Sequence, residues 1–588
     1  MRGHVKNLAV LFAIGACMSV TIAAHAEKEN WNQQFQKVSD EYLDQVYFRY
    51  QPTQGTLAGY HQYDTQLEDF SRNSIDAESA ALKTFEKRVA SIPATALDQT
   101  ARGDREIVLG SIRSRLLTLE SIRPWQKDAD IYSSTAANAA FTIMERKFAS
   151  PDDRLRSLIA REKQMPALLA EARANLANPP RIFTGIAIEQ LPGTTGFFEH
   201  DIPLAFADAQ DPALKAEFAQ TNAAVIAAFN SYLDWLKSDL LPRSNGDFRI
   251  GAETYAKKLQ YDEMVDVPLD KLLEIGKADL RKNQEHFNAI AKELEPSKAP
   301  RAVLEELGEN HPAPGQLLDA FRATFNSLDG FIRSHHIVTI PSEVRPIVEE
   351  TPPFMRATTF ASMDTPGPYE KHATEAYFNV TLPDPSMTPV QVEGFMHSFN
   401  VGTVISTAVH EAYPGHYVQF LWVPQAPSRV RKLLGATTNV EGWAHYTEQM
   451  MLDEGYGQPG QGAKDERESK FLRLGQLQDA LLRDARFVVG IEMHTGKMSF
   501  DEAVEFFQRE GYQSRETAVV ETKRGTGDPT YLYYTLGKLE ILKLREDLKK
   551  KQGADFSLEE FHNSFLRQGF PPIKIVREAL LGDDSPTL

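Results

Sequence analysis

Two histidines and two glutamates stand at positions that suit a catalytic metal ion. Residues 410–416 read His-Glu-Ala-Tyr-Pro-Gly-His, and Glu441 opens a second patterned segment further along the chain. Two imidazoles and a carboxylate are common protein ligands of a catalytic zinc ion, which keeps a fourth position open for water. We therefore predict that His410, His416 and Glu441 bind Zn²⁺ and that Glu411 acts beside it as the general base.

The spacing of the two histidines is not the common one. In the usual motif the histidines are four residues apart and share one helix face. A spacing of six corresponds to about 600° of rotation, which leaves the rings roughly 120° apart on a regular helix. Pro414 has no N–H to donate to the carbonyl of His410, and Gly415 tolerates an irregular backbone. We expect a widened turn or bulge that brings the rings together. A helix end with two unrelated histidines is the alternative.

The segments that carry these ligands have helical patterns. Residues 401–409 are apolar with several small side chains, as is typical of a buried helix. Residues 440–452 repeat apolar or aromatic side chains at a helical period, which places Glu441, His445 and Glu448 on one stripe. Burying such a stripe without partners is costly. We predict that His445 and Glu448 orient the metal ligands; the alternative for these two is a solvated helix face.

Three motifs resemble those of the DUF885 family. They are residues 410–416, Glu-Gly-Trp-Ala-His-Tyr at 441–446, and Tyr-Leu-Tyr-Tyr-Thr-Leu-Gly-Lys at 531–538. The resemblance covers most of the chain, more weakly in its first half, and implies a mainly helical zinc metallopeptidase of the gluzincin kind. One departure is Asp-Pro-Thr at 528–530, where the family often has Pro-Gly-Gln. Substrate contacts at this point are therefore expected to differ.

The third motif offers groups that act on the substrate. Tyr534 matches the tyrosine of the family's Tyr-x-x-Gly pattern, and a phenol can donate to the oxyanion that develops beside a metal. Tyr533 and Tyr531 are the alternatives for that role, and Tyr531 is also assigned to substrate binding. Arg524 could bind a substrate carboxylate through two hydrogen bonds, as an exopeptidase requires. For these side chains, packing in a helix and an ordinary surface position are the alternatives.

Together these residues predict hydrolysis of short peptides by a zinc-activated water, with Glu411 passing the proton to the leaving amine. Two other functions remain open: a non-catalytic peptide-binding protein of the cell envelope, and a zinc hydrolase of a non-peptide amide or ester. The sequence does not separate carboxypeptidase, aminopeptidase and dipeptidase activity. A homodimer is left open as well.

Residues 1–26 have the pattern of a secretory signal. A basic start and an apolar run lead to Ala-His-Ala at 24–26, a small-x-small cleavage site. We expect a periplasmic or secreted protein beginning near Glu27. Acylation at Cys17 as a lipoprotein is a less favoured alternative, and the run is short for a retained membrane span. Because Cys17 is the only cysteine, the exported chain would depend on its core without disulfides.

The charge balance excludes some partners. The formal charge is 64 − 81 = −17, and removal of Arg2 and Lys6 with the signal gives 62 − 81 = −19. Such an acidic chain repels phosphate backbones and anionic lipid surfaces. We therefore expect neither nucleic acid nor an anionic membrane as a partner.

Periodicity predicts a mainly α fold. Helical periods dominate residues 27–247, and a Pro-rich, charged stretch at 296–314 is the nearest thing to a boundary. Strand patterns appear in residues 337–340, 354–360 and 376–382.

The domain prediction is one metallopeptidase-like domain over residues 27–588. It has an N-terminal lobe of about 27–295 and a zinc-binding lobe of about 315–588, which flank a deep active-site cleft with a small sheet at its wall. The edge of that sheet could pair with an extended peptide, or the sheet could be purely structural. Residues 521–529 read as a loop that leads into a helix.

Overall fold

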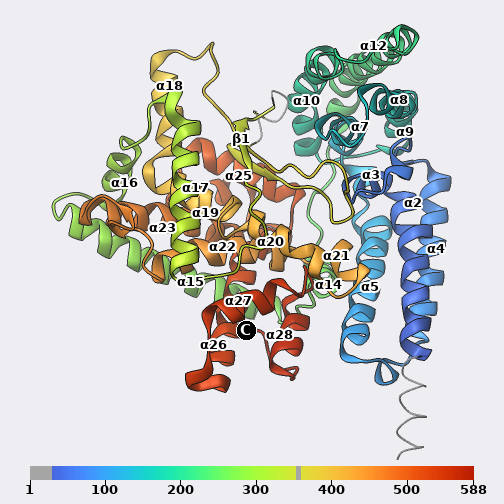
Figure 1. Cartoon of the computed structure of the whole chain (residues 1–588). Helices are drawn as coiled ribbons and strands as arrows, with labels where there is room; N and C mark the ends of the chain where they lie inside the picture. The colour runs from blue at the N-terminus through green and yellow to red at the C-terminus, as the bar shows by residue number, and fades with distance from the viewer. Residues whose placement is uncertain (1–29, 353–355, 357–358) are drawn as a thin grey trace, which may run out of the picture.

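The computed structural model describes residues 30–352, 356 and 359–588. The predicted secretory signal and Cys17 lie outside these residues. The described chain is mainly helical with a small mixed sheet, as predicted. In Figure 1 the blue and teal helices of the first part lie at one side of the molecule, and the green to red helices make up the rest.

The first part of the chain is a succession of helices joined by short turns. It begins with a helix over residues 30–42. The elements that follow are η1 (Leu43–Tyr47), α2 (Phe48–Tyr50), α3 (Pro52–Leu57), η2 (His61–Tyr63), α4 (Arg72–Ala90), η3 (Ala94–Ala96), α5 (Gln99–Leu117), η4 (Thr118–Ile122), α6 (Pro124–Lys127), α7 (Asp130–Glu145), α8 (Pro151–Glu162), α9 (Met165–Asn175), α10 (Arg181–Gly196), η5 (Phe197–Asp201), α11 (Ile202–Ala205), α12 (Pro212–Trp235), η6 (Leu236–Leu240) and α13 (Leu241–Arg243).

A middle part connects these helices to the region of the predicted metal ligands. Its helices are α14 (Ala252–Glu263), α15 (Leu269–Leu294), α16 (Pro300–Gly308), η7 (Pro314–Gln316) and α17 (Leu317–Ser334). The sequence placed α15 in the first lobe, but its Leu280 and Phe287 share a core with Leu474 and Leu481 of the later helix α23 (Glu466–His494). α15 therefore packs mainly with residues that follow it in the chain.

The three-stranded sheet consists of β1 (Ile347–Glu350), β2 (Ala361–Asp364) and β3 (Tyr377–Val380). β3 is central, parallel to β1 and antiparallel to β2, with Phe378 opposite Val348 and Met363. The predicted strand at 376–382 is confirmed by β3. The strand expected at 337–340 is wrong, because those residues join no ladder. Of 354–360, residues 354, 355, 357 and 358 lie outside the described part, and β2 starts just after the segment.

The remaining elements surround the predicted metal ligands. They are α18 (Pro389–Met396), η9 (His397–Phe399), α19 (Val401–Glu411), α20 (His416–Trp422), η10 (Val423–Gln425), α21 (Arg429–Leu433), α22 (Thr437–Asp453), β4 (Gln458–Pro459), β5 (Gly462–Ala463), α23, α24 (Phe500–Arg509), α25 (Arg515–Gly527), α26 (Tyr533–Gln552), η11 (Gly553–Asp555), α27 (Leu558–Leu566) and α28 (Ile573–Leu581). The loop predicted at 521–529 is wrong, since α25 continues to Gly527.

The apolar core explains how these elements are held. One large cluster joins α17, the sheet, α19, α20, α22 and α26–α28, and it includes Phe325, Phe378, Tyr413 and Trp443. A separate cluster joins α7 to α12. Burial at roughly 25 cal/mol per Å² of apolar surface stabilises both. In the part of the chain that the structure describes, no helix combines the length and the apolar character that a membrane crossing needs.

Candidate metal centre

The two histidines lie on either side of a break between two helices. α19 ends at Glu411 and α20 starts at His416, and the Tyr413–Pro414 peptide bond between them is cis. The N–H of Gly415 donates to the carbonyl of Val409 at 2.9 Å. A Cβ on Gly415 would lie 1.8 Å from the carbonyl oxygen of His410, so glycine is required by this close approach.

This turn brings the two imidazoles together. The ring centroids of His410 and His416 are 4.8 Å apart and the rings are nearly perpendicular. The widened turn or bulge that we expected within one helix is therefore wrong in form. A helix end and a new helix start produce the convergence, because the chain bends sharply over residues 412–415.

Helix α22 brings the third residue to the same place. The indole N–H of Trp443 donates to the carbonyl of Pro414 at 2.9 Å, which ties this helix to the turn between the histidines. The carboxylate of Glu263, from α14, accepts hydrogen bonds from the backbone N–H groups of Thr437 and Thr438. These bonds satisfy donors at the start of α22 that no helical carbonyl reaches. The position of Glu441, in the first turns of α22, is thus fixed from both sides.

Glu441 and the two histidines form a set that fits a metal ion. Oε2 of Glu441 lies 3.4 Å from Nε2 of His410 and 3.5 Å from Nε2 of His416, and all three atoms lie within 4.8 Å of one another. Neighbouring ligands of a tetrahedral zinc, with bonds of about 2.0–2.2 Å, are about 3.3 Å apart. Oε2 of Glu441 is buried and, among the described residues, has no hydrogen-bond partner. The donor types, the spacing and this orphaned oxygen all suit zinc.

Glu448 orients His410. Its Oε1 lies 2.7 Å from Nδ1 of His410 and 3.1 Å from the guanidinium of Arg483, and its Oε2 lies 3.2 Å from Nδ1 of His445. Burial raises the pKa of Glu448, but Arg483 and His445 outweigh it and hold the pKa below its usual range. The ionised carboxylate only accepts, so Nδ1 of His410 donates and Nε2 is the ring nitrogen that faces Glu441. His445 and Glu448 thus lie beside the ligands, buried rather than solvated.

The charges of His410, His416 and Glu441 favour a cation between these side chains. Burial raises the pKa of Glu441, but His416 and His410 lower it well below its usual range, so the carboxyl is ionised. Burial lowers the pKa of His410, yet Glu441 and Glu448 together raise it to about 9. A proton therefore occupies Nε2 of His410 when no metal is bound, and metal binding would displace it.

Glu411 and Tyr534 are the predicted reacting groups. Glu411 is half-buried at the end of α19, and within the described part of the chain its carboxylate has no hydrogen bond or ion pair. The ring of Tyr534 lies 6.3 Å from the ring of His410, centroid to centroid, and its hydroxyl accepts a hydrogen bond from Arg524 at 3.2 Å. Burial raises the pKa of Tyr534, so the phenol stays protonated and can donate.

Arg524 and Tyr531 differ in their access to solvent. The side chain of Arg524 is 38% exposed and lies 3.5 Å from Asp528 and 3.3 Å from the hydroxyl of Tyr533. Tyr531 is wholly buried, and a Cβ on Gly525 would lie 2.3 Å from its hydroxyl. This ring packs inside the cluster formed by α23, α24 and α25. Tyr531 therefore has no exposed surface for a substrate, and we assign it to the core.

Comparison with known proteins places the chain in a family. The family described as "Bacterial protein of unknown function (DUF885)" matches residues 52–580. The chain belongs to the DUF885 family. That part of the resemblance seen in the motifs is confirmed, whereas the metallopeptidase activity stays a prediction, because the family description names no function.

Two solved structures share the fold of this DUF885 chain. A proposed lipoprotein of unknown function from Shewanella oneidensis is 28% identical, covers 93% of this chain and 99% of its own, and superposes with a TM-score of 0.77. A proposed lipoprotein from Colwellia psychrerythraea is 18% identical, with shares of 95% and 99% and a TM-score of 0.78. A comparison with curated proteins finds no match.

Charged residues of α23 surround this DUF885 site, and the sequence motifs do not indicate them. The guanidinium carbons of Arg483 and Arg486 lie 5.4 and 5.0 Å from the ring centroid of Tyr534. Arg486 also makes two hydrogen bonds to Glu521, at 2.6 and 2.8 Å. The sequence does carry one signal of them. The two arginines are three residues apart in a largely apolar stretch, and charges that are buried require partners.

Lys538 belongs to the third sequence motif, and its contacts in the structure indicate a structural role. It is buried and binds Asp279 of α15 at 2.7 Å. Because Tyr534 lies one helical turn before Lys538 on α26, this ion pair fixes the helix that presents the phenol.

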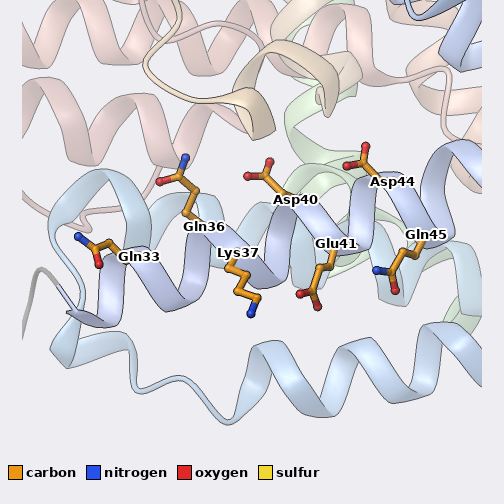
Figure 2. A pocket seen from close by; sticks show the side chains of 7 residues that line it. All are labelled: Gln33, Gln36, Lys37, Asp40, Glu41, Asp44 and Gln45. Atoms are coloured by element: carbon orange, nitrogen blue, oxygen red, sulfur yellow. The ribbon is translucent and has the colours of Figure 1, made fainter. Parts of the chain in front are cut away.

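A different surface feature has polar walls but no metal-binding set. A hollow of about 410 Å³ lies along the helix of residues 30–42 and η1, lined by Gln33, Gln36, Lys37, Asp40, Glu41, Asp44 and Gln45. Figure 2 shows Gln36, Asp40 and Asp44 on one side of this helix, with Lys37, Glu41 and Gln45 on the other. Asp40 and Asp44 bind Arg429 of α21, at 3.2 and 2.6 Å. These carboxylates therefore join the first helix to the C-terminal part.

Proposed function

We propose that this chain is an exported zinc-dependent peptidase that hydrolyses short peptides. The observation that carries the proposal is the convergence of two imidazole Nε2 atoms, at 3.4 and 3.5 Å, on one buried carboxylate oxygen of Glu441 that has no hydrogen bond. Three protein ligands leave room for water and substrate, unlike the four that usually fill a structural zinc site.

The roles of the residues follow from their contacts. His410, His416 and Glu441 would hold the zinc ion, which when bound would acidify a water molecule and polarise the scissile carbonyl. Glu411, free of other partners in the described structure, accepts the proton from water and returns it to the leaving amine.

Three further residues orient a metal ligand or bind the substrate. Glu448 keeps Nε2 of His410 aimed at the metal position. The phenol of Tyr534 donates a hydrogen bond to the carbonyl oxygen as it becomes negative. Arg524, adjacent to Tyr534 and partly exposed, binds the terminal carboxylate of the peptide. A carboxylate contact of this kind favours an exopeptidase.

An extracytoplasmic location supports this function. The pattern of residues 1–26 is that of a secretory signal, and the two related structures are both described as proposed lipoproteins. Acylation at Cys17 would place the enzyme at a membrane surface, and cleavage after Ala26 would release it. The acidic charge fits neither nucleic acid nor anionic lipid as a substrate.

The test is cleavage of a mixed peptide library by the purified protein, followed by mass spectrometry of the products. We expect cleavage that a chelator abolishes and added zinc restores. Zinc content should fall from that of the parent in His410→Ala and in Glu441→Ala. Zinc-dependent binding of peptides without any cleavage would contradict the proposal in favour of a binding protein. Cleavage confined to non-peptide amides or esters would contradict the substrate class alone.

A further inference from the structure

A second cluster of metal-binding side chains lies away from the first in sequence. His311, in the connection between α16 and η7, meets Glu393 of α18 and His397 at the start of η9. Nitrogen or oxygen ligand atoms of the three residues all lie within 4.8 Å of one another. None of these residues belongs to the three sequence motifs.

The hydrogen bond of His311 fixes which nitrogen faces the cluster. Its Nδ1 lies 2.9 Å from the carbonyl oxygen of Pro312. A carbonyl only accepts, so Nδ1 carries the hydrogen and Nε2 of the neutral ring carries the lone pair. Nε2 lies 3.2 Å from Oε1 of Glu393. Two acceptors at this distance repel each other unless a proton or a metal ion lies between them.

His397 approaches the same carboxylate oxygen. Its Nε2 lies 3.7 Å from Oε1 of Glu393, four residues earlier in the same helical stretch. A Cβ on Gly308 would lie 3.1 Å from the ring of His397, so the ring packs closely against α16. The cluster thus has the same ligand types as the first centre, with imidazole-to-carboxylate distances of 3.2 and 3.7 Å against 3.4 and 3.5 Å.

We propose that His311, Glu393 and His397 form a second binding site for a divalent transition-metal ion such as Zn²⁺. Two imidazoles select such an ion over Ca²⁺ or Mg²⁺, which prefer oxygen ligands. The site binds more weakly than the first, because the side chain of Glu393 is 62% exposed and that of His397 is 40% exposed, so both must be ordered on binding. Water completes the coordination.

The contacts of this cluster indicate what the second ion does. The carbonyl of Asn310, next to His311, accepts a hydrogen bond from the N–H of Val401 at 2.9 Å. The side chain of Asn400 donates to the carbonyl of His397 at 3.2 Å, and its oxygen caps the first turn of α19. An ion here therefore braces the start of α19, the helix that carries His410 near its end. The site is independent of the proposed peptidase activity.

The first experiment counts zinc ions bound to metal-free protein. We expect two equivalents in the parent, by titration and by elemental analysis after gel filtration at a zinc concentration that fills the weaker site. The variant His410→Ala/His416→Ala should keep one equivalent. In that background His397→Gln should weaken the remaining site by more than about tenfold, a loss that removal of even an outer partner of a metal ligand can cause.

The matched control is His200→Gln. His200 lies 3.8 Å from Glu199 and is 78% exposed, so it is a surface imidazole-carboxylate pair without a second histidine. This change should leave the affinity of the second site as it was. Should the double variant of the first centre not fold, the same comparison is made in the parent, where His397→Gln should lower the count from two to one while circular dichroism stays the same.

Two results would overturn the proposal. One is a parent that binds a single equivalent with no further site at millimolar zinc. The other is an equal effect of His397→Gln and His200→Gln on the second equivalent. Either would mean that a proton, not a metal ion, joins His311 to Glu393. Loss of peptidase activity plays no part in the decision.

Discussion

At the scale of single residues, the orientation of His410 depends on Glu448. Glu448→Gln should weaken zinc binding by about 10–100-fold, as is typical when the partner of a ligating histidine is removed. Zinc titration of the metal-free variant measures this loss. Glu78→Gln is the matched control, because Glu78 is equally buried and binds Arg115 at 2.7 and 2.9 Å in another part of the chain. A similar loss of zinc affinity in both variants would mean a general effect on the fold.

Glu411, the proposed general base, has a different expected result. Glu411→Gln should bind zinc like the parent but lose at least about 100-fold in kcat, because the amide cannot accept the proton. Exposed Glu516 of α25 provides the control, Glu516→Gln, which should keep full activity. Steady-state cleavage of a peptide identified in the library gives kcat. Retained turnover in Glu411→Gln would remove Glu411 from the role of base.

The position of Arg524 predicts a preference for a free peptide carboxyl group. Arg524→Gln should raise KM for a free-acid peptide by about 10-fold or more, the loss expected for a hydrogen bond to a charged group of about 1.5–3 kcal/mol. Cleavage of the amidated peptide should be slow in the parent and unchanged in the variant. Arg509→Gln, at an exposed position of α24, is the control. Equal cleavage of acid and amide by the parent would exclude this contact.

The residue types in the motifs predict which side chains converge, but they do not predict every side chain around the site. The convergence of His410, His416 and Glu441 could be predicted, since few other functions need these residue types together. Tyr531 is predicted to bind the substrate, yet it precedes α26 and packs in the core with α23, α24 and α25. Arg483 was missed because a helix pattern does not show which polar side chain meets a buried partner on another helix.

At the scale of elements, the close crossing of α22 and α26 places Glu441. A Cβ on Gly537 would lie 2.0 Å from the carbonyl oxygen of Thr438, near the start of α22. Gly537→Ala should lower the free energy of unfolding by about 1–3 kcal/mol or more through overpacking, and should weaken zinc binding as α22 shifts. Chemical denaturation and zinc titration measure the two effects.

Gly193→Ala in α10 is the control for this change. A Cβ there meets nothing within 4 Å, so alanine should be neutral or stabilising by up to about 1 kcal/mol through helix propensity. Unchanged stability and zinc affinity in Gly537→Ala would show that α22 and α26 can separate without loss.

Helix patterns predicted the elements around the centre better than its connections. The helix expected at 440–452 lies within α22. Residues 521–529 contain Gly and Thr, which predict a loop. The structure instead keeps this segment helical up to Gly527, because Thr522 and Thr526 are buried and Glu521 pairs with Arg486. Tertiary contacts override weak local preference at such places.

At the scale of the whole molecule, buried His562 should make the fold sensitive to acid. Nδ1 of His562 donates to the carbonyl of Ile337 at 2.7 Å, and Nε2 accepts from the hydroxyl of Tyr446 at 2.8 Å. Burial lowers the pKa of His562 from 6.5 to about 3. The unfolded chain therefore takes up a proton below pH 6.5 that the folded chain does not. Stability is lost as the pH falls from 6.5 to about 3, by a few kcal/mol in total.

His562→Gln tests this source of acid sensitivity. The variant should be less stable at pH 7, because its hydrogen bonds are poorer, but its free energy of unfolding should fall less between pH 6.5 and 4. Urea denaturation at several pH values measures the slope. His372→Gln, at an exposed position, should keep the parental slope. An unchanged slope in His562→Gln would assign the acid sensitivity to other groups.

Long-range packing was the least predictable property from sequence. The mainly α fold and a small sheet follow from periodicity, but the partner of each helix does not. Val430, Leu434 and Ile575, from late in the chain, pack with the core of α4 and α5. Such contacts join residues hundreds of positions apart, and no local pattern encodes them. The predicted deep cleft and homodimer remain predictions.

Helix α19 lies between the two proposed metal sites and sets part of the distance between them. It lies between His397, which precedes it, and His410 near its end, and the nine steps from Val401 to His410 span about 14 Å at 1.5 Å per residue. If both proposed sites are loaded with Cu²⁺, two unpaired electrons lie on either side of this helix. Their magnetic dipolar coupling, recorded by pulsed electron resonance in frozen solution, would report whether the distance between the two sites changes when a peptide binds.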